Sequence, residues 1–228
     1  MKIELFSKPQ SPTIIVGFPG VGLVGPIVTE FLIEHMKTDL IGKFVYDELP
    51  AMAAVHKGKI IHPMSLHYSA KYNVLIVYTI LNLHGSEWSI AQAIAGLANE
   101  LKAKDILCVD GANTFGEEES RIYTYGNQKL LATGAKLMEE SVVMGVPGAL
   151  LLSLPNTSCI FATTHIEMQD SKAAAEAVKF LDKYLGLDVD YQPLLQQAAQ
   201  FEEKLKSLMT KSQKMIDAQD KKSMDYLG

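Results

Sequence analysis

Apolar runs alternate with amphipathic stretches along residues 1–190. Continuous apolar runs bounded by turn-forming residues predict buried strands, whereas apolar residues spaced three and four apart predict helices. The predicted strands are Thr13–Phe18, Asp39–Val45, Lys59–Tyr68, Tyr72–Leu81, Asp105–Val109, Arg121–Tyr125 and Ser158–Thr164. The predicted helices are Ile27–Met36, a helix capped by Ser86 that runs to Ala103, Pro147–Leu154 and Ser171–Leu185. Because strands and helices alternate, we predict a central sheet sandwiched between two layers of helices.

Two of the predicted strands, Lys59–Tyr68 and Tyr72–Leu81, are joined by a short polar turn. Parallel neighbours need a crossover of about a dozen residues or more, so this pair must be antiparallel and the sheet mixed. Tyr72–Leu81 is nearly all apolar, which predicts a central position, and Arg121–Tyr125 is predicted as an edge strand. The predicted fold class is therefore α/β, a three-layer α/β/α sandwich with a mixed central sheet.

From residue 194 onward, apolar residues step by four and three in turn, which is the spacing of a coiled-coil seam. The seam consists of Leu194, Ala198, Phe201, Leu205, Leu208, Ser212 and Met215. A long C-terminal helix of this kind packs either on its own domain or against a partner subunit, and the spacing leaves both open. We divide the chain into an α/β core domain at 1–190, a helical extension at 191–222 and a flexible tail at 223–228.

The composition narrows the classes of function. The chain has 228 residues, 48% of them hydrophobic, and a net charge of −5. It lacks the basic character that nucleic acids and anionic membranes attract. No apolar run approaches the roughly 20 residues of a membrane-spanning helix, and Met1–Glu4 does not resemble a signal peptide. We therefore expect a cytoplasmic protein with no nucleic-acid partner and no membrane partner.

Neither cysteine nor histidine indicates a metal or redox site. Cys108 and Cys159 each lie inside an apolar run, which predicts buried free thiols rather than a disulfide. No pair among the six histidines has the i, i+4 spacing and intervening glutamate of a zinc hydrolase, and no C-x-x-C motif is present. We predict no metal and no cofactor.

The segment Gly20–Gly25 fits the G-x-G-x-x-G pattern of a dinucleotide-binding turn. Proline is tolerated at the first helical position, so we predict that the next helix starts at Pro26 with Gly25 as its cap. The acid expected about 20 residues further on is also out of place, since Asp39 opens the second strand rather than closing it. We therefore interpret the glycines as a tight strand-to-helix crossing, in which small residues let helix and sheet approach.

Polar residues follow several of the predicted strands. In open α/β sheets ligands bind in the crevice beyond the carboxyl ends of the strands, which makes these residues candidates for one pocket. The candidate crevice residues are Gly20, Gly22, Gly25, His84, Ser86, Asp110 and His165. They support an alternative function, an enzyme that acts on a nucleoside or nucleotide. However, no G-x-S-x-G elbow presents Ser86 as a nucleophile, and helix capping by Ser86 and a turn at Asp110 explain both residues without chemistry.

Several motifs occur in order along the chain: Gly17–Gly25, Asp47–Pro50, Val146–Leu152, Asp170–Ala174 and Leu185–Asp190, followed by Pro193–Leu195 and the long helix. Taken together, they resemble the proteasome assembly chaperone 2 family in its archaeal branch. The resemblance covers nearly the whole chain. It implies a three-layer α/β domain of the phosphorylase/hydrolase-like type, assembly into homo-oligomers and no catalytic activity.

The resemblance also implies a partner. Some archaeal members insert their C-terminal tails into pockets between α subunits of the 20S proteasome core, using a hydrophobic-Tyr-any tripeptide. Here the candidate tail is Tyr226, Leu227 and Gly228, with the tyrosine third from the end rather than second. We expect a non-catalytic, homo-oligomeric assembly chaperone or scaffold that contacts proteasome α subunits through this tail. A ring-forming relative that does not bind the proteasome is a further alternative.

Overall fold

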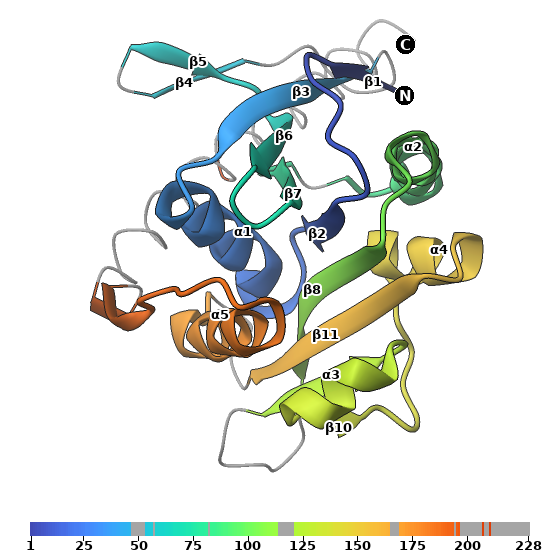
Figure 1. Cartoon of the computed structure of the whole chain (residues 1–228), viewed down its shortest axis with the longest axis vertical. Coiled ribbons are helices and arrows are strands. Elements are labelled where there is room, and N and C mark those ends of the chain that lie inside the picture. Colours follow the sequence, from blue (N-terminus) through green and yellow to red (C-terminus); the bar gives the residue numbers. More distant parts are fainter. Residues whose placement is uncertain are drawn as a thin grey trace, which may run out of the picture.

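A nine-stranded mixed sheet with helices on both faces forms the centre of the molecule (Figure 1). The computed structural model describes residues 1–46, 53–56, 58–81, 83–113, 121–164, 169–193, 195–196, 207 and 210. Within these residues the sheet has the order β1-β3-β6-β7-β2-β8-β11-β9-β10. The predicted α/β/α sandwich with a mixed sheet is confirmed.

The four strands β7, β2, β8 and β11 run parallel in the middle of the sheet, and antiparallel pairs lie outside them. The strands of this sheet are β1 Lys2–Leu5, β2 Thr13–Gly17, β3 Asp39–Val45, β6 Met64–Ser69, β7 Val74–Thr79, β8 Asp105–Asn113, β9 Ile122–Tyr125, β10 Lys136–Leu137 and β11 Thr157–Thr164. All six residues of β7 are buried, as its apolar sequence predicted. Because parallel strands share one direction, the carboxyl ends of β7, β2, β8 and β11 meet at one edge of the sheet.

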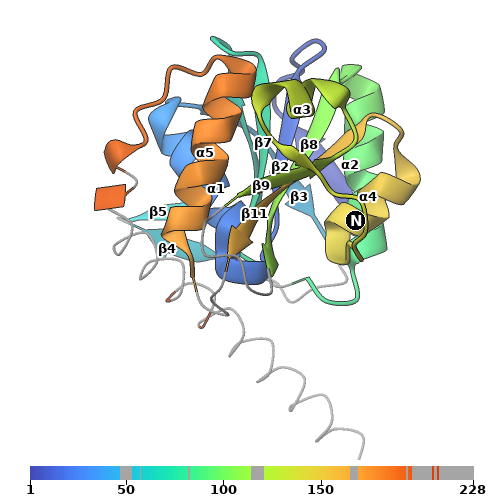
Figure 2. The same ribbon diagram turned by 90° about the horizontal axis from the view of Figure 1, so that it is seen from below.

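Helices α1 and α5 pack together on one face of the sheet, and α2 and α4 pack together on the other (Figure 2). The helices are α1 Val24–His35, α2 Glu87–Leu101, α3 Gln128–Thr133, α4 Gly145–Ser153 and α5 Ser171–Leu185. Alternate strand residues supply the two cores. Ile15 and Leu107 belong to the α1/α5 side, whereas Ile14 and Cys108 belong to the α2/α4 side.

The predicted thiol state is confirmed, since Cys108 and Cys159 are both buried and free. They lie opposite each other in the register of β8 and β11. The hydrogen bond with the Cys159 thiol, followed by burial, raises the pKa of Cys108 well above its usual value. Both sulfurs therefore act as small apolar groups in the core.

The expected strand over Lys59–Tyr68 was wrong as a single element. Its first part is β5 (Lys59–Ile61), which pairs with β4 (Ala54–His56) in a separate two-stranded sheet, and its second part is β6. Pro63 separates them because proline has no backbone N–H to donate to a ladder. The Pro63 carbonyl instead accepts a hydrogen bond from the Ile80 N–H, at 3.2 Å.

Two further expectations need correction at the other side of the sheet. The predicted strand Asp105–Val109 ends too early, because β8 continues to Asn113, which pairs in register with Thr164 of β11. The expected edge strand is β9, which lies between β11 and the two-residue β10 and so is not an edge. The pattern of apolar residues also failed to reveal β1, α3 and β10.

The predicted C-terminal helix lies almost entirely beyond the described residues. Of the residues proposed for its seam or for oligomer contacts, Leu194, Ala198, Phe201, Leu205, Leu208 and Met215 all fall there. The tail residues Tyr226, Leu227 and Gly228 fall there too. These predictions stay predictions.

Candidate ligand site at the carboxyl ends of the parallel strands

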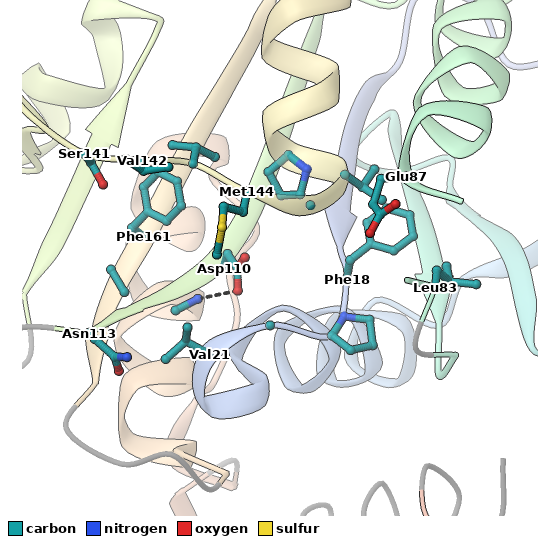
Figure 3. Close-up of a pocket in the computed structure, with 18 of the residues that line it drawn as sticks. Phe18, Val21, Leu83, Glu87, Asp110, Asn113, Ser141, Val142, Met144 and Phe161 are labelled. Carbon is teal, nitrogen blue, oxygen red and sulfur yellow. Dashed lines mark hydrogen bonds between the residues drawn. The ribbon is translucent and has the colours of Figure 1, made fainter. Parts of the chain in front are cut away.

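A cavity of about 380 Å³ opens beyond the carboxyl ends of the parallel strands (Figure 3). The chain leaves β2 through α1 toward β3, whereas it leaves β7 through α2 toward β8, on the opposite side of β2. Connections that diverge in this way create a crevice between neighbouring strand ends, which is where open α/β sheets bind ligands. The cavity therefore has the position and size of a small-molecule site.

The wall of the cavity is mainly apolar. Phe18 and Val21 follow β2, Phe161 comes from β11, and Leu83 lies between β7 and α2. Met144 and its neighbours, just before α4, complete the wall. Phe18 and Phe161 are buried, whereas Met144 is largely exposed.

Asp110 is the acidic group deepest in the sheet at this site. It belongs to β8, and its Oδ1 accepts a hydrogen bond from the Gly111 N–H at 2.7 Å. Burial raises the pKa of Asp110 to about 7, against the opposing effect of that hydrogen bond. Gly20 packs so closely that a Cβ there would overlap the Asp110 carboxyl. The missing side chain at position 20 therefore leaves room for the carboxyl.

A second carboxyl, that of Glu87, lines the cavity from the first turn of α2. His84 Nδ1 lies 3.8 Å from Glu87 Oε1, and the imidazole is 88% exposed at the rim. Asn113 and Ser141 add neutral polar groups. Among the described residues that line the cavity, none is lysine or arginine. The wall therefore carries negative charge, which opposes binding of a phosphate.

The glycine turn differs from the predicted one at the start of α1. The helix begins at Val24 rather than Pro26, and its cap is Leu23, in the left-handed conformation with φ 50°, rather than Gly25. Pro26 is still tolerated because the first four N–H groups of a helix have no partner within the helix. The expected helix start was wrong because the 3₁₀ turn Val21–Leu23 carries the chain directly into α1.

Gly22 and Gly25 do not line the cavity and serve packing instead. A Cβ at Gly25 would lie 2.7 Å from the Val109 carbonyl oxygen of β8, so only glycine permits this approach of helix and sheet. Gly22 has φ 64°, and its carbonyl accepts a hydrogen bond from the Asp170 N–H at 2.8 Å. This geometry agrees with the tight crossing that the sequence pattern predicted.

Asp170 closes the side of the turn that faces α5. Its Oδ1 accepts from the Ala173 N–H at 2.9 Å and caps α5, and its Oδ2 accepts from Thr164 Oγ1 at 2.7 Å. In a dinucleotide fold the pyrophosphate lies at the start of the helix after the glycines. Here a carboxylate and the N-terminus of α5 pack against that turn.

Of the predicted crevice residues, the structure brings Gly20, His84 and Asp110 to the cavity. Ser86 is adjacent but does not line it, and its side chain makes no capping hydrogen bond to α2. His165 lies outside the described residues. The prediction missed Phe18, Glu87, Phe161 and residues 141–147. Phe18 directly follows a strand and was recoverable on that basis, whereas residues 141–147 carry no such signal.

The described part of the chain contains no cluster of three histidine, cysteine or acidic side chains placed to hold a metal ion. No helix within the same residues has the length and apolarity needed to span a membrane.

Comparison with known proteins identifies relatives over nearly the full length. The crystal structure of Pyrococcus furiosus PbaA, described as an archaeal homolog of proteasome-assembly chaperone, matches with a TM-score of 0.84 and 26% identity, over 93% of this chain and 99% of that one. Pyrococcus furiosus PbaB, described as an archaeal proteasome activator, matches with a TM-score of 0.72 and 19% identity, over 91% and 98%. At that identity, the likeness to PbaB shows the fold alone.

An uncharacterized protein of Methanocaldococcus jannaschii is 24% identical over 96% of this chain and 94% of its own length. The sequence profile of the PAC2 family matches residues 14–209. These residues include the glycine turn, the residues that line the cavity and the four parallel strands except Thr13, the first residue of β2. The chain belongs to the PAC2 family.

Proposed function

We propose that this protein is a non-catalytic assembly chaperone or scaffold that acts on the 20S proteasome core as a homo-oligomer. Family membership and the likeness to PbaA support a chaperone-like role. The observation that carries the proposal is that likeness, which extends over 93% of this chain and 99% of PbaA. The described residues contain no cluster placed to hold a metal ion, so this feature does not favour metal-dependent catalysis.

The proposed contact with the proteasome is the tail Tyr226–Gly228. It follows a polar stretch, Asp217–Asp225, so Tyr226 and Leu227 are the bulky apolar side chains of a hydrophilic segment. An aromatic anchor on a polar segment is suited to capture by a pocket in a partner. Because the tyrosine is third from the end, docking here would differ by one position from the hydrophobic-Tyr-any arrangement.

Self-association is proposed to use the surface around α4. Val142, Met144 and Leu152 are 84%, 78% and 79% exposed, although each is a large apolar side chain. Exposed apolar clusters of this kind mark surfaces that a partner covers. A second copy of the chain is the proposed partner, and the C-terminal seam would add a further contact.

A binding titration against an archaeal 20S core and its free α subunits tests the tail. Full-length protein should bind saturably, and deletion of 226–228 or Tyr226→Ala should abolish binding. Tyr125→Ala is the matched control, because Tyr125 is 54% exposed on β9, away from the tail in sequence. Absence of binding by the full-length protein would contradict the proteasome as partner and favour the ring-forming alternative.

Native mass spectrometry with light scattering tests the oligomer. The wild-type chain should be an oligomer, and the double substitution Val142→Asp with Leu152→Asp should dissociate it, because each carboxylate would be buried in the interface. Val55→Asp, at a 68% exposed position on the β4–β5 hairpin, is the control for the charge change itself. A monomeric wild-type protein would contradict this part of the proposal.

A further inference from the structure

The cavity combines an apolar wall with carboxyl groups. The proposed self-association surface shares Val142 and Met144 with this wall, but the proposed chaperone contacts do not require Asp110, Glu87, Phe18 or Phe161. We propose that this cavity binds a small organic cation, an ammonium or guanidinium group that pairs with Asp110, on an apolar body that packs against Phe18 and Phe161. The cavity, at about 380 Å³, falls in the size range of small-molecule sites.

The residues around the cavity suit an aromatic apolar ligand with one polar end. Phe18 directly follows β2, Phe161 belongs to β11, and both are buried, so their positions are fixed by the core. Aromatic faces attract cations as well as apolar groups, which suits an amine carried on an aromatic body. Figure 3 shows these rings, Met144 and the Asp110 carboxyl around the same space.

The charge of the site favours a positively charged ligand over a negatively charged one. Asp110 Oδ1 is engaged by the Gly111 N–H, and within the described part of the chain Oδ2 has no hydrogen-bond partner. Glu87 adds a second carboxyl from α2, and no lysine or arginine among the described residues lines the wall. A cation gains a charge-assisted hydrogen bond from Oδ2, whereas an anion meets two carboxyl groups.

The protonation of Asp110 fits the same ligand. Because burial raises the pKa of Asp110 to about 7, part of this carboxyl is protonated at neutral pH, and a bound cation would favour its ionised form. The other titratable groups near it are Glu87 and His84 at the cavity and the Cys108 thiol on the same strand. Binding should therefore release protons and should strengthen as pH rises through about 7.

Three probes that share one indole body distinguish charge from apolar contact. Tryptamine is cationic, tryptophol is neutral and indole-3-acetate is anionic. Calorimetric titration of the full-length protein, in its own oligomeric state, should show saturable binding of tryptamine, at least about tenfold tighter than that of tryptophol. Indole-3-acetate should bind more weakly still. Equal affinity for tryptamine and tryptophol, or no tryptamine binding, would overturn the proposal.

Asp110→Asn should reduce tryptamine affinity by about tenfold or more and leave tryptophol affinity unchanged, because the amide keeps the shape and the acceptor for Gly111. Asp105→Asn is the matched control, since it removes the same charge from the opposite end of the same strand. Unchanged tryptamine affinity in Asp110→Asn would contradict the assignment.

A second variant tests the proposal without a substitution at Asp110, so the test does not depend on whether Asp110→Asn folds. Ser141 is exposed and lines the mouth of the cavity, so Ser141→Lys adds a cation without disturbing the core. It should weaken tryptamine binding and strengthen indole-3-acetate binding. If neither affinity changes, the probes bind elsewhere and the proposal fails. None of these measurements involves the proteasome, so their outcome is separate from that of the proposed function.

Discussion

The two sides of the glycine turn have opposite packing, although the same strands, β2 and β8, support both. On the α5 side, Gly25 lies against backbone atoms of β8 and of residues 17 and 18, and Gly22 lies against the Thr164 and Asp170 side chains. On the α4 side, Gly20 and Val21 border an open cavity. The comparison teaches that a glycine pattern indicates close packing of the backbone around the turn. A phosphate site would also require open space at the start of the helix.

The largest expected loss of stability comes from adding a side chain on the closed side, at Gly25. In Gly25→Ala the new Cβ would meet the Val109 and Phe18 carbonyl oxygens at 2.7 and 2.8 Å, and backbone atoms cannot move aside locally. We expect a loss of about 3 kcal/mol in the free energy of unfolding, measured by urea denaturation at fixed protein concentration.

Gly96→Ala is the control for that measurement. Gly96 lies within α2, and a Cβ there has no atom within 4 Å. Alanine should stabilise the helix by about 0.5–1 kcal/mol. If Gly25→Ala lowered the free energy of unfolding no more than Gly96→Ala, this result would contradict the tight packing described around Gly25.

The second prediction uses a half-buried base on the α1 side, His67. His67 packs edge-on against Tyr78, its Nε2 lies 3.0 Å from Ser65 Oγ, and burial lowers its pKa to about 4. The unfolded chain binds a proton near pH 6.5 that the folded chain refuses until about pH 4, so stability falls as pH falls through this window.

That loss should amount to at most about 3 kcal/mol, and His67→Gln should remove it when unfolding is compared from pH 7 to pH 4. The cavity side behaves in the opposite way. The raised pKa of Asp110 makes the folded state hold a proton that the unfolded state releases, so its contribution is lost as pH rises toward 7. Identical pH slopes in wild type and His67→Gln would contradict the burial of a neutral imidazole.

The third prediction tests whether side chains on the cavity side can shift to make room for an added methyl group. In Gly20→Ala the added Cβ meets the Asp110 carboxyl, a side chain, rather than backbone. We expect a loss of about 1–2 kcal/mol. Because Asp110→Ala removes the obstructing group, the double variant should be more stable than the sum of the two single losses predicts. A strictly additive cycle in denaturation experiments would show that the two residues do not compete for space.

The smallest effect is expected at Asp170. Its carboxylate caps α5 and accepts the Thr164 hydroxyl, so Asp170→Ala should cost about 1–2 kcal/mol, the range of a lost helix cap. Asp170→Asn keeps the acceptor and should retain most of the stability. Thermal denaturation of both variants checks this, and equal melting temperatures for Asp170→Ala and wild type would contradict the closure described for this side.

The elements predicted best are those whose pattern is decided locally. The α5 helix has the predicted bounds, because Asp170 caps it and Gly186, with φ 65°, ends it. The β3 strand also has the predicted bounds. In contrast, β8 runs past Asp110 and Gly111, which are turn-forming residues locally, because pairing with β11 holds them extended. That pairing depends on residues far along the chain, so local pattern could not reveal it.

The residues of the candidate site also divide into those that local sequence could predict and those that it could not. Gly20, His84 and Asp110 were predictable because the ends of parallel strands meet at one edge. Residues 141–147 close the cavity only because α4 packs on α2, a contact with no sequence signature. Sequence therefore predicted polar residues and Gly20 at the strand ends, and missed Phe18, Phe161, Glu87 and the side that the α4 segment supplies.

The hydrogen bond between the Asp170 N–H and the Gly22 carbonyl joins the start of the chain to a late segment. In addition, β11 occupies a place inside the sheet, between β8 and β9, although it follows both in sequence. During synthesis the glycine turn and the inner face of α1 therefore cannot form their contacts with α5 until α5 has left the ribosome. Such long-range closure slows folding, so the chain depends on its last core helix to complete its first one.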